Sequence, residues 1–132
     1  MSTLHRDPQA PQTRPQTLAG RRARVAAGAY LALALVGLVG TWYFNLAFGA
    51  SGSGQSYLQA WFANPASSSA AVDVIVTAVV ACLFYLREGA RLGWRWLPVA
   101  LVPLTFALAL AFTFPLFLAA RELRLIERSR GA

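Results

Sequence analysis

Three long apolar stretches, almost free of charge, constrain this chain more than any other feature. They cover residues 25–48, 69–86 and 96–120, and Asp73 is the single charged residue within them. A helix of about 20 apolar residues crosses the hydrocarbon core of a bilayer, which is roughly 30 Å thick. Inside lipid the backbone must satisfy its own hydrogen bonds, so such segments fold as helices. The sequence therefore predicts an all-α integral membrane bundle of three transmembrane helices.

The charged residues lie in short patches at the ends of these stretches. The chain has 12 basic residues, all arginine, and five acidic residues, for a net charge of +7. Because the arginines stand at the edges of apolar runs, and not along one helix face, we expect no binding to nucleic acid. One cysteine, Cys82, excludes a disulfide scaffold, and an apolar share of 57% excludes a disordered chain.

The patches divide the chain into three parts. Residues 1–24 are basic and proline-rich and are expected to form a disordered tail. Residues 25–120 form the transmembrane domain, and residues 121–132 form a basic C-terminal tail. A cleaved signal peptide is the alternative for the first stretch, but its apolar run is much longer than the usual length of about 7–15 residues.

Arginine counts beside the apolar stretches predict the orientation, because basic loops stay on the cytoplasmic side. Residues 1–24 and the loop at residues 87–95 are arginine-rich, whereas residues 49–68 carry no charge. The N-terminus is therefore expected on the cytoplasmic side. The arginine-only, alanine-rich composition is typical of a GC-rich bacterial genome, so we expect the membrane to be the plasma (inner) membrane of a bacterium. With three spans the tail at residues 121–132 would lie outside, although it carries four arginines. The predicted position of that tail contradicts the positive-inside rule, but the first helix and the contrast between the two loops usually dominate, so the predicted orientation is kept.

The outer loop is expected to contain a short helix lying in the membrane interface. Tyr57, Leu58, Trp61 and Phe62 recur on one helical face, and aromatic side chains favour the headgroup region. The alternative role for this face is a lid over a pocket, or a patch that binds a partner. The candidate contact residues are Tyr57, Trp61, Phe62 and Asn64.

Helix boundaries are marked by glycine, proline and serine. Gly89 and Gly93 are expected to stop the second span, and one of the serines at positions 67–69 is expected to cap its start. Pro103 and Pro115 are expected to kink the third span.

Asp73 is the only ionisable residue inside the apolar stretches, and a charge at membrane depth is costly. Near a helix N-terminus it can serve structure alone, because the helix dipole and interfacial water stabilise a carboxylate there. It can also serve as a proton site or a ligand anchor. Our hypothesis is that Asp73 faces the bundle interior and bonds Asn45 or Tyr43. The candidate polar cluster in the membrane is Asp73, Asn45, Tyr43, Thr77 and Thr113.

No catalytic signature, metal-ligand cluster or phosphate-binding loop is present in the sequence, so no cofactor is expected. Glu88 is expected to pair with Arg91 or Arg87 at the turn. We expect a non-enzymatic membrane component, surrounded by lipid and associated with itself or with a larger membrane complex. The alternatives are a lipid- or isoprenoid-handling protein, possibly an enzyme, and a proton-coupled transport subunit, each using Asp73.

Several short motifs follow one another in a specific order: FANPASSS at residues 62–69, VDV at 72–74, LREGAR at 86–91, WLP at 96–98 and PLFL at 115–118. In this order they resemble the small bacterial membrane proteins of the domain-of-unknown-function 2834 family, over about residues 28–123. The positions that match the family pattern are Asn64, Asp73, Glu88, Gly89 and Pro115. The resemblance implies a three-helix membrane protein and supplies no activity.

Overall fold

The computed structural model describes residues 14–131, and this part of the chain contains helices and no strands. The predicted all-α class is confirmed. The elements are α1 (Arg14–Ala50), α2 (Tyr57–Trp61), α3 (Pro65–Arg91), α4 (Leu97–Ala107) and α5 (Leu110–Gly131).

Two helices, α1 and α3, are long and apolar enough to cross a membrane. Helix α1 begins at Arg14, within the tail that we expected to be disordered, because residues 19–24 lie against the end of α5. Residues 1–13 of that predicted tail lie outside the described part. The predicted basic tail after residue 120 is likewise helical, as the second half of α5.

Helix α3 starts earlier than the sequence indicated. Asn64 is its N-cap: the side chain accepts from the Ser67 amide at 3.0 Å, while the Ser67 hydroxyl accepts from the Asn64 amide at 3.3 Å. Pro65 follows at the first helical position, where its missing amide hydrogen leaves no bond unmade. The expected serine cap is therefore wrong, and Ser67 acts instead as the reciprocal partner of Asn64.

Gly93 ends helix α3, as predicted, whereas the predicted stop at Gly89 is wrong. Gly93 has a φ of 70°, and the next amide, of Trp94, donates to the Gly89 carbonyl at 2.9 Å. Gly89 lies inside α3, where a Cβ atom would stand 2.0 Å from Cγ of Pro98. Gly89 therefore allows α4 to pack closely on α3.

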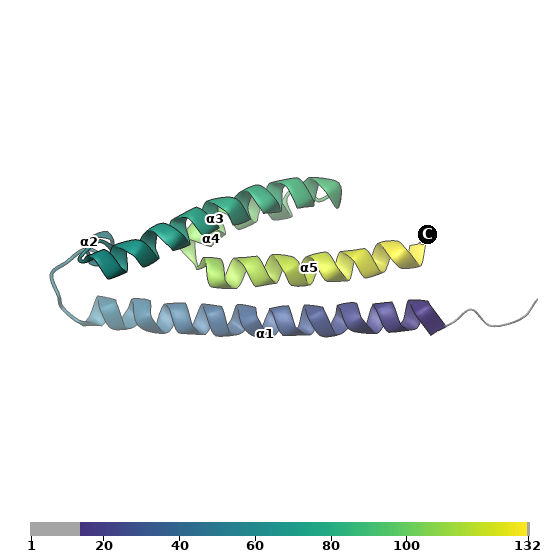
Figure 1. Cartoon of the computed structure of the whole chain (residues 1–132), viewed down its shortest axis with the longest axis horizontal. Helices are drawn as coiled ribbons and strands as arrows, with labels where there is room; N and C mark the ends of the chain where they lie inside the picture. Colours follow the sequence, from purple (N-terminus) through teal and green to yellow (C-terminus); the bar gives the residue numbers. More distant parts are fainter. Residues whose placement is uncertain (1–13, 132) are drawn as a thin grey trace, which may run out of the picture.

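The predicted third span, residues 96–120, is not a single helix. Its two ends both lie at the C-terminal end of α3, because Pro98 packs on Gly89 and Arg121 pairs with Glu88. The chain therefore leaves this end of α3 along α4 and returns to it along α5 (Figure 1). Three spanning helices are thus not confirmed.

The reversal lies between α4 and α5, at Leu108 and Ala109. The hydroxyl oxygens of Thr105 and Thr113 are 2.9 Å apart, whereas eight residues of continuous helix would separate them by about 12 Å. Neither Pro103 nor Pro115, the expected kinks, marks this break, because each lies inside a helix.

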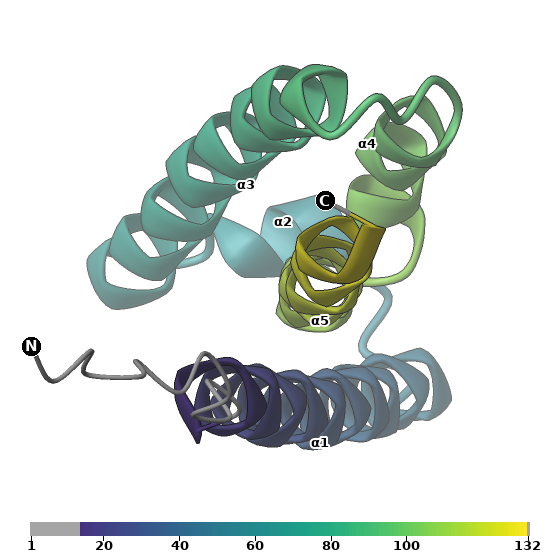
Figure 2. The ribbon, with the colours of Figure 1, turned by 90° about the vertical axis from the view of Figure 1, so that its right-hand side faces the viewer.

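Helices α1 and α5 run antiparallel to each other (Figure 1) and lie side by side in the view along the bundle (Figure 2). Gly37 permits this approach at one level, since a Cβ atom there would stand 2.2 Å from the Ala111 carbonyl oxygen. That carbonyl has no helical amide partner, because residue 115 is proline. The less exposed face of α1 repeats at alternating steps of three and four residues: Gly20, Ala23, Ala27, Tyr30, Ala34, Gly37 and Thr41.

The core lies where α3, α4 and α5 meet. Tyr85 and Phe117 are fully buried, and their rings lie 4.9 Å apart between centroids. Trp94, in the turn after α3, stacks edge-on against Phe117 at 5.7 Å. The core residues are Ala81, Cys82, Tyr85, Leu101 and Phe117.

Candidate functional site

The polar cluster expected around Asp73 is not assembled. Asp73 is exposed and makes no side-chain hydrogen bond or ion pair with residues 18–131. It follows the buried Ala71 by two residues, which at 3.6 residues per turn turns it roughly 200° away from the interior. The expected bond to Asn45 or Tyr43 is therefore absent from the described chain.

The other members of that predicted cluster are dispersed. Asn45 accepts a hydrogen bond from the Tyr57 hydroxyl at 2.6 Å. Tyr43 is exposed and lies edge-on against Phe44, and Thr77 is exposed on α3. Only Thr113 is buried.

Thr113 belongs to a different set of hydroxyl groups, at the reversal between α4 and α5. It receives a hydrogen bond from the Tyr85 hydroxyl at 3.3 Å, lies 2.9 Å from the Thr105 hydroxyl and bonds the Ala109 carbonyl at 3.1 Å. Thr105 in turn donates to the Leu101 carbonyl at 2.8 Å. These bonds join three helices and satisfy the buried hydroxyls, so the set stabilises the reversal.

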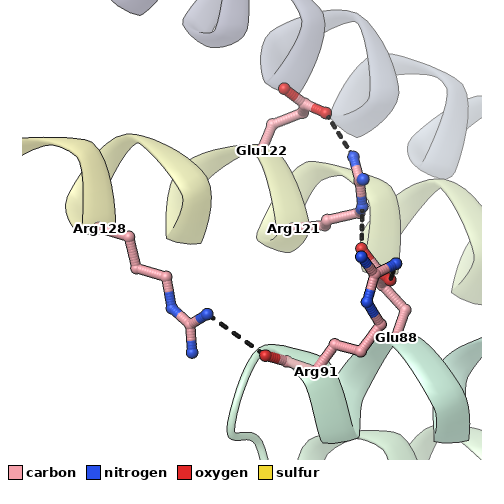
Figure 3. A network of polar contacts seen from close by, with 5 residues as sticks. All are labelled: Glu88, Arg91, Arg121, Glu122 and Arg128. Carbon is pink, nitrogen blue, oxygen red and sulfur yellow. Dashed lines mark hydrogen bonds and ion pairs between the residues drawn. The ribbon is translucent and has the colours of Figure 1, made fainter.

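A second polar group lies at the other end of the α3–α5 interface, and we call it the ion-pair cluster: Glu88, Arg91, Arg121, Glu122 and Arg128 (Figure 3). Glu88 is 7% exposed. Its carboxylate accepts from Arg121 Nε at 2.8 Å and from Arg91 Nη1 at 3.1 Å. Charge-assisted bonds of this kind are stronger than neutral ones.

The remaining contacts of the ion-pair cluster tie α5 to the end of α3. Arg121 also pairs with Glu122 at 3.1 Å, and Arg128 donates to the Arg91 carbonyl at 3.3 Å. The hydrogen bond to Glu88 holds the pKa of Arg121 above its ordinary value, so this guanidinium stays charged. The predicted Glu88–Arg91 pair is confirmed. The contact with Arg121 was not predicted, because Arg121 lies 33 positions away along the chain.

The expected contact face of the outer loop packs partly inward. Tyr57 touches Phe48 of α1 and Trp61 of its own helix, with ring centroids 5.4 Å apart in each pair. Asn64 is used as the cap of α3, and Phe62 is exposed. A crevice of about 360 Å³ lies between α1, α2 and α3, lined by Phe44, Asn45, Phe48, Tyr57, Ala60, Trp61, Ser67, Ala70, Ala71 and Val74.

The buried thiol and the buried carboxylate of these sites are either packed in the core or paired with arginine. Within residues 14–131, no group of three or more histidine, cysteine, aspartate and glutamate side chains converges as metal ligands would. Cys82 is buried in the core. Glu88, the buried carboxylate, is already engaged by two arginines.

A comparison with known protein families matches residues 29–123 to a family described as protein of unknown function DUF2834. No curated protein and no solved structure gives a significant match. The matched segment runs from the middle of α1 through Arg121 in the ion-pair cluster. The chain therefore belongs to the DUF2834 family.

Proposed function

We propose that this chain is a multi-pass membrane protein that acts as a small, non-enzymatic subunit of a membrane assembly. The observation that carries the membrane placement is the exposure of its apolar helices. Only 11% of the apolar window in α1 and 28% of that in α3 is buried, whereas the core helix of a soluble protein would be mostly covered. Lipid supplies the missing cover.

In this proposal α1 and α3 span the bilayer, and α4 and α5 form a re-entrant hairpin. Helix α4 has 11 residues and is about 16 Å long, half the thickness of the hydrocarbon core. The buried hydroxyls at its end stay bonded within the protein, as a turn at membrane depth requires.

The hairpin also supports one orientation. All three arginine-rich segments lie at one end of the bundle: the start of α1, the turn after α3 and the end of α5 (Figure 1). The positive-inside rule places this end in the cytoplasm. The conflict raised by the basic C-terminal segment disappears, because two spans and a hairpin return it to the side of the N-terminus.

The subunit role is supported by the face of α3 that carries Asp73. Asp73 lies eight residues after Pro65, about 12 Å along the helix. A carboxylate facing lipid at depth costs about 2.5–3.5 kcal/mol at the bilayer centre. Another helix with a polar or basic side chain removes that cost, so we expect this face to lie at an interface.

A proton-coupled transport subunit is the second candidate, since Asp73 is the one ionisable group in the apolar part of α3 and has no side-chain partner among residues 18–131. A lipid-handling role is less well supported, because Asp73 does not line the crevice under α2.

Disulfide cross-linking in membranes tests the subunit role. Val76→Cys places a thiol on the exposed α3 face near Asp73, and Leu46→Cys places one on an equally exposed part of α1. With Cys82 replaced by alanine in both variants, we expect oxidation to give a discrete cross-linked product for Val76→Cys only. The Asp73→Asn change should weaken that product. No product, or equal products from both positions, contradicts the role assigned to this face.

A further inference from the structure

A groove of about 660 Å³ lies between the first turns of α1 and the last turns of α5, and none of the residues of the two polar sites described above lines it. Three arginines line it: Arg21 and Arg24 from α1 and Arg130 from α5. Its remaining lining is apolar or uncharged: Ala19, Gly20, Ala23, Leu125, Ile126 and Ser129. No carboxylate among residues 18–131 lines it.

None of the three arginines of this groove has an acidic partner among residues 18–131. Glu88 and Glu122 are paired with Arg121, and Glu127 is paired with Arg124 at 3.0 Å. The acidic residues at this end are therefore paired with arginines outside the groove. The groove is lined by three arginines whose charge no carboxylate among residues 18–131 neutralises, and a bound anion would supply that partner.

The level of the groove identifies the anion. Arg24 directly precedes the uncharged run of α1, and the uncharged part of α5 ends at Ala120, between one and two turns before Leu125, where the groove lining on α5 begins. The groove thus begins where the apolar surface of the bundle ends, which is the headgroup level in the proposed membrane placement. Its apolar floor of alanine, leucine and isoleucine suits the glycerol and upper acyl carbons of a lipid. Basic pockets between helices on the cytoplasmic side are typical sites for anionic lipid headgroups.

From this we infer that the groove between α1 and α5 binds the phosphodiester of an anionic phospholipid. Helix α1 packs mainly on α5, so the lipid would join the two antiparallel helices at one end of their interface. This inference rests on the proposed membrane placement. Different results would contradict the two proposals. If alkaline carbonate extracts the wild-type chain from membranes, the membrane placement is wrong. If the chain stays in the membrane but shows no preference for an anionic lipid, only the proposed lipid site is wrong.

Native mass spectrometry of the full chain from micelles containing phosphatidylglycerol and phosphatidylcholine measures the binding. The groove variant is Arg21→Gln with Arg24→Gln and Arg130→Gln. The matched control, Arg22→Gln with Arg87→Gln and Arg95→Gln, removes the same charge at the same end from residues outside the groove lining. We expect the wild type to retain phosphatidylglycerol selectively. The groove variant should lose affinity by about tenfold or more and the control by less than about threefold, since scattered arginines contribute only general attraction.

Two outcomes overturn the inference. Equal losses in the groove variant and the control show general surface attraction and no site. Displacement of the lipid by inorganic phosphate, at an ionic strength matched with chloride, shows a site for free phosphate and not for lipid. The single change Arg24→Gln, expected to lower the affinity by an intermediate factor, keeps the test open should the triple variant fold poorly.

Discussion

The contact between Glu88 and Arg121 should contribute most of the polar stabilisation between α3 and α5. Glu88 accepts two charge-assisted bonds, but its two partners differ in exposure: the Arg121 side chain is 31% exposed and the Arg91 side chain 79%. An exposed pair such as Glu88–Arg91 contributes about 0–1 kcal/mol. A hydrogen bond to a charged group away from water contributes about 1.5–3 kcal/mol.

Glu88→Gln removes the charge while keeping the shape and one acceptor oxygen. We therefore expect a loss of roughly 2 kcal/mol in the free energy of unfolding, about a 30-fold change in the folding equilibrium. The Arg121→Gln change should lose a similar amount. In the double variant the losses should not add, and the coupling should be about 1–2 kcal/mol.

The assay is unfolding of the detergent-solubilised chain by SDS, followed by tryptophan fluorescence, because Trp94 packs on Phe117 beside this contact. The matched control is Glu127→Gln, which breaks an exposed ion pair with Arg124. Its N–O distance of 3.0 Å is close to the 3.1 Å of the Glu88–Arg91 pair. Its loss should stay below about 0.5 kcal/mol. The reasoning is refuted should Glu88→Gln destabilise the chain no more than Glu127→Gln does.

Two further substitutions test the packing at the other end of the bundle. Thr113→Val keeps the volume of a fully buried side chain but removes its hydrogen bonds to Tyr85 and Thr105. The free energy of unfolding in the same SDS titration should fall by about 0.5–1.5 kcal/mol. An unchanged midpoint would show that these bonds do not stabilise the reversal. Gly37→Ala places a methyl group against the Ala111 backbone and should lower the free energy of unfolding by about 1–3 kcal/mol. In the control Gly40→Ala the methyl group meets nothing within 4 Å, so the change should be neutral or slightly stabilising. Similar effects from both changes would contradict the close packing of α1 on α5.

The sequence was informative wherever local chemistry decides the structure. The apolar runs predicted α1 and α3, the aromatic spacing predicted α2, and the positive φ of Gly93 follows from a glycine placed just after the last helical turn. The repeat of small residues along α1 was also readable, at alternating steps of three and four residues, and would have predicted a close helical partner.

The reversal between α4 and α5 was hidden because it depends on contacts between distant residues. A run of 25 uncharged residues fits one straight span or two half-length helices equally well, and neither proline lies at the break. The pairs Gly89–Pro98 and Glu88–Arg121 decide between these folds. The one sign in the sequence was the basic segment after residue 120, which conflicts with a third span.

The exposed position of Asp73 could not be read from depth alone. Asn45, Thr77 and Thr113 fall at similar levels along their helices, but level does not fix the direction of a side chain around the axis. In the structure Asn45 is hydrogen-bonded to Tyr57, and Thr113 is hydrogen-bonded to Tyr85. Asp73 lies on the exposed face of α3, away from both.

The side of the membrane on which the C-terminus lies tests the central claim most directly. In a Cys82→Ala background, Gly131→Cys, Arg22→Cys and Ser53→Cys report the end of α5, the start of α1 and the loop after it. A membrane-impermeant maleimide applied to intact cells should label only Ser53→Cys, and Gly131→Cys should react only after permeabilisation, like Arg22→Cys. Labelling of Gly131→Cys together with Ser53→Cys in intact cells would show a third spanning helix and contradict the re-entrant hairpin.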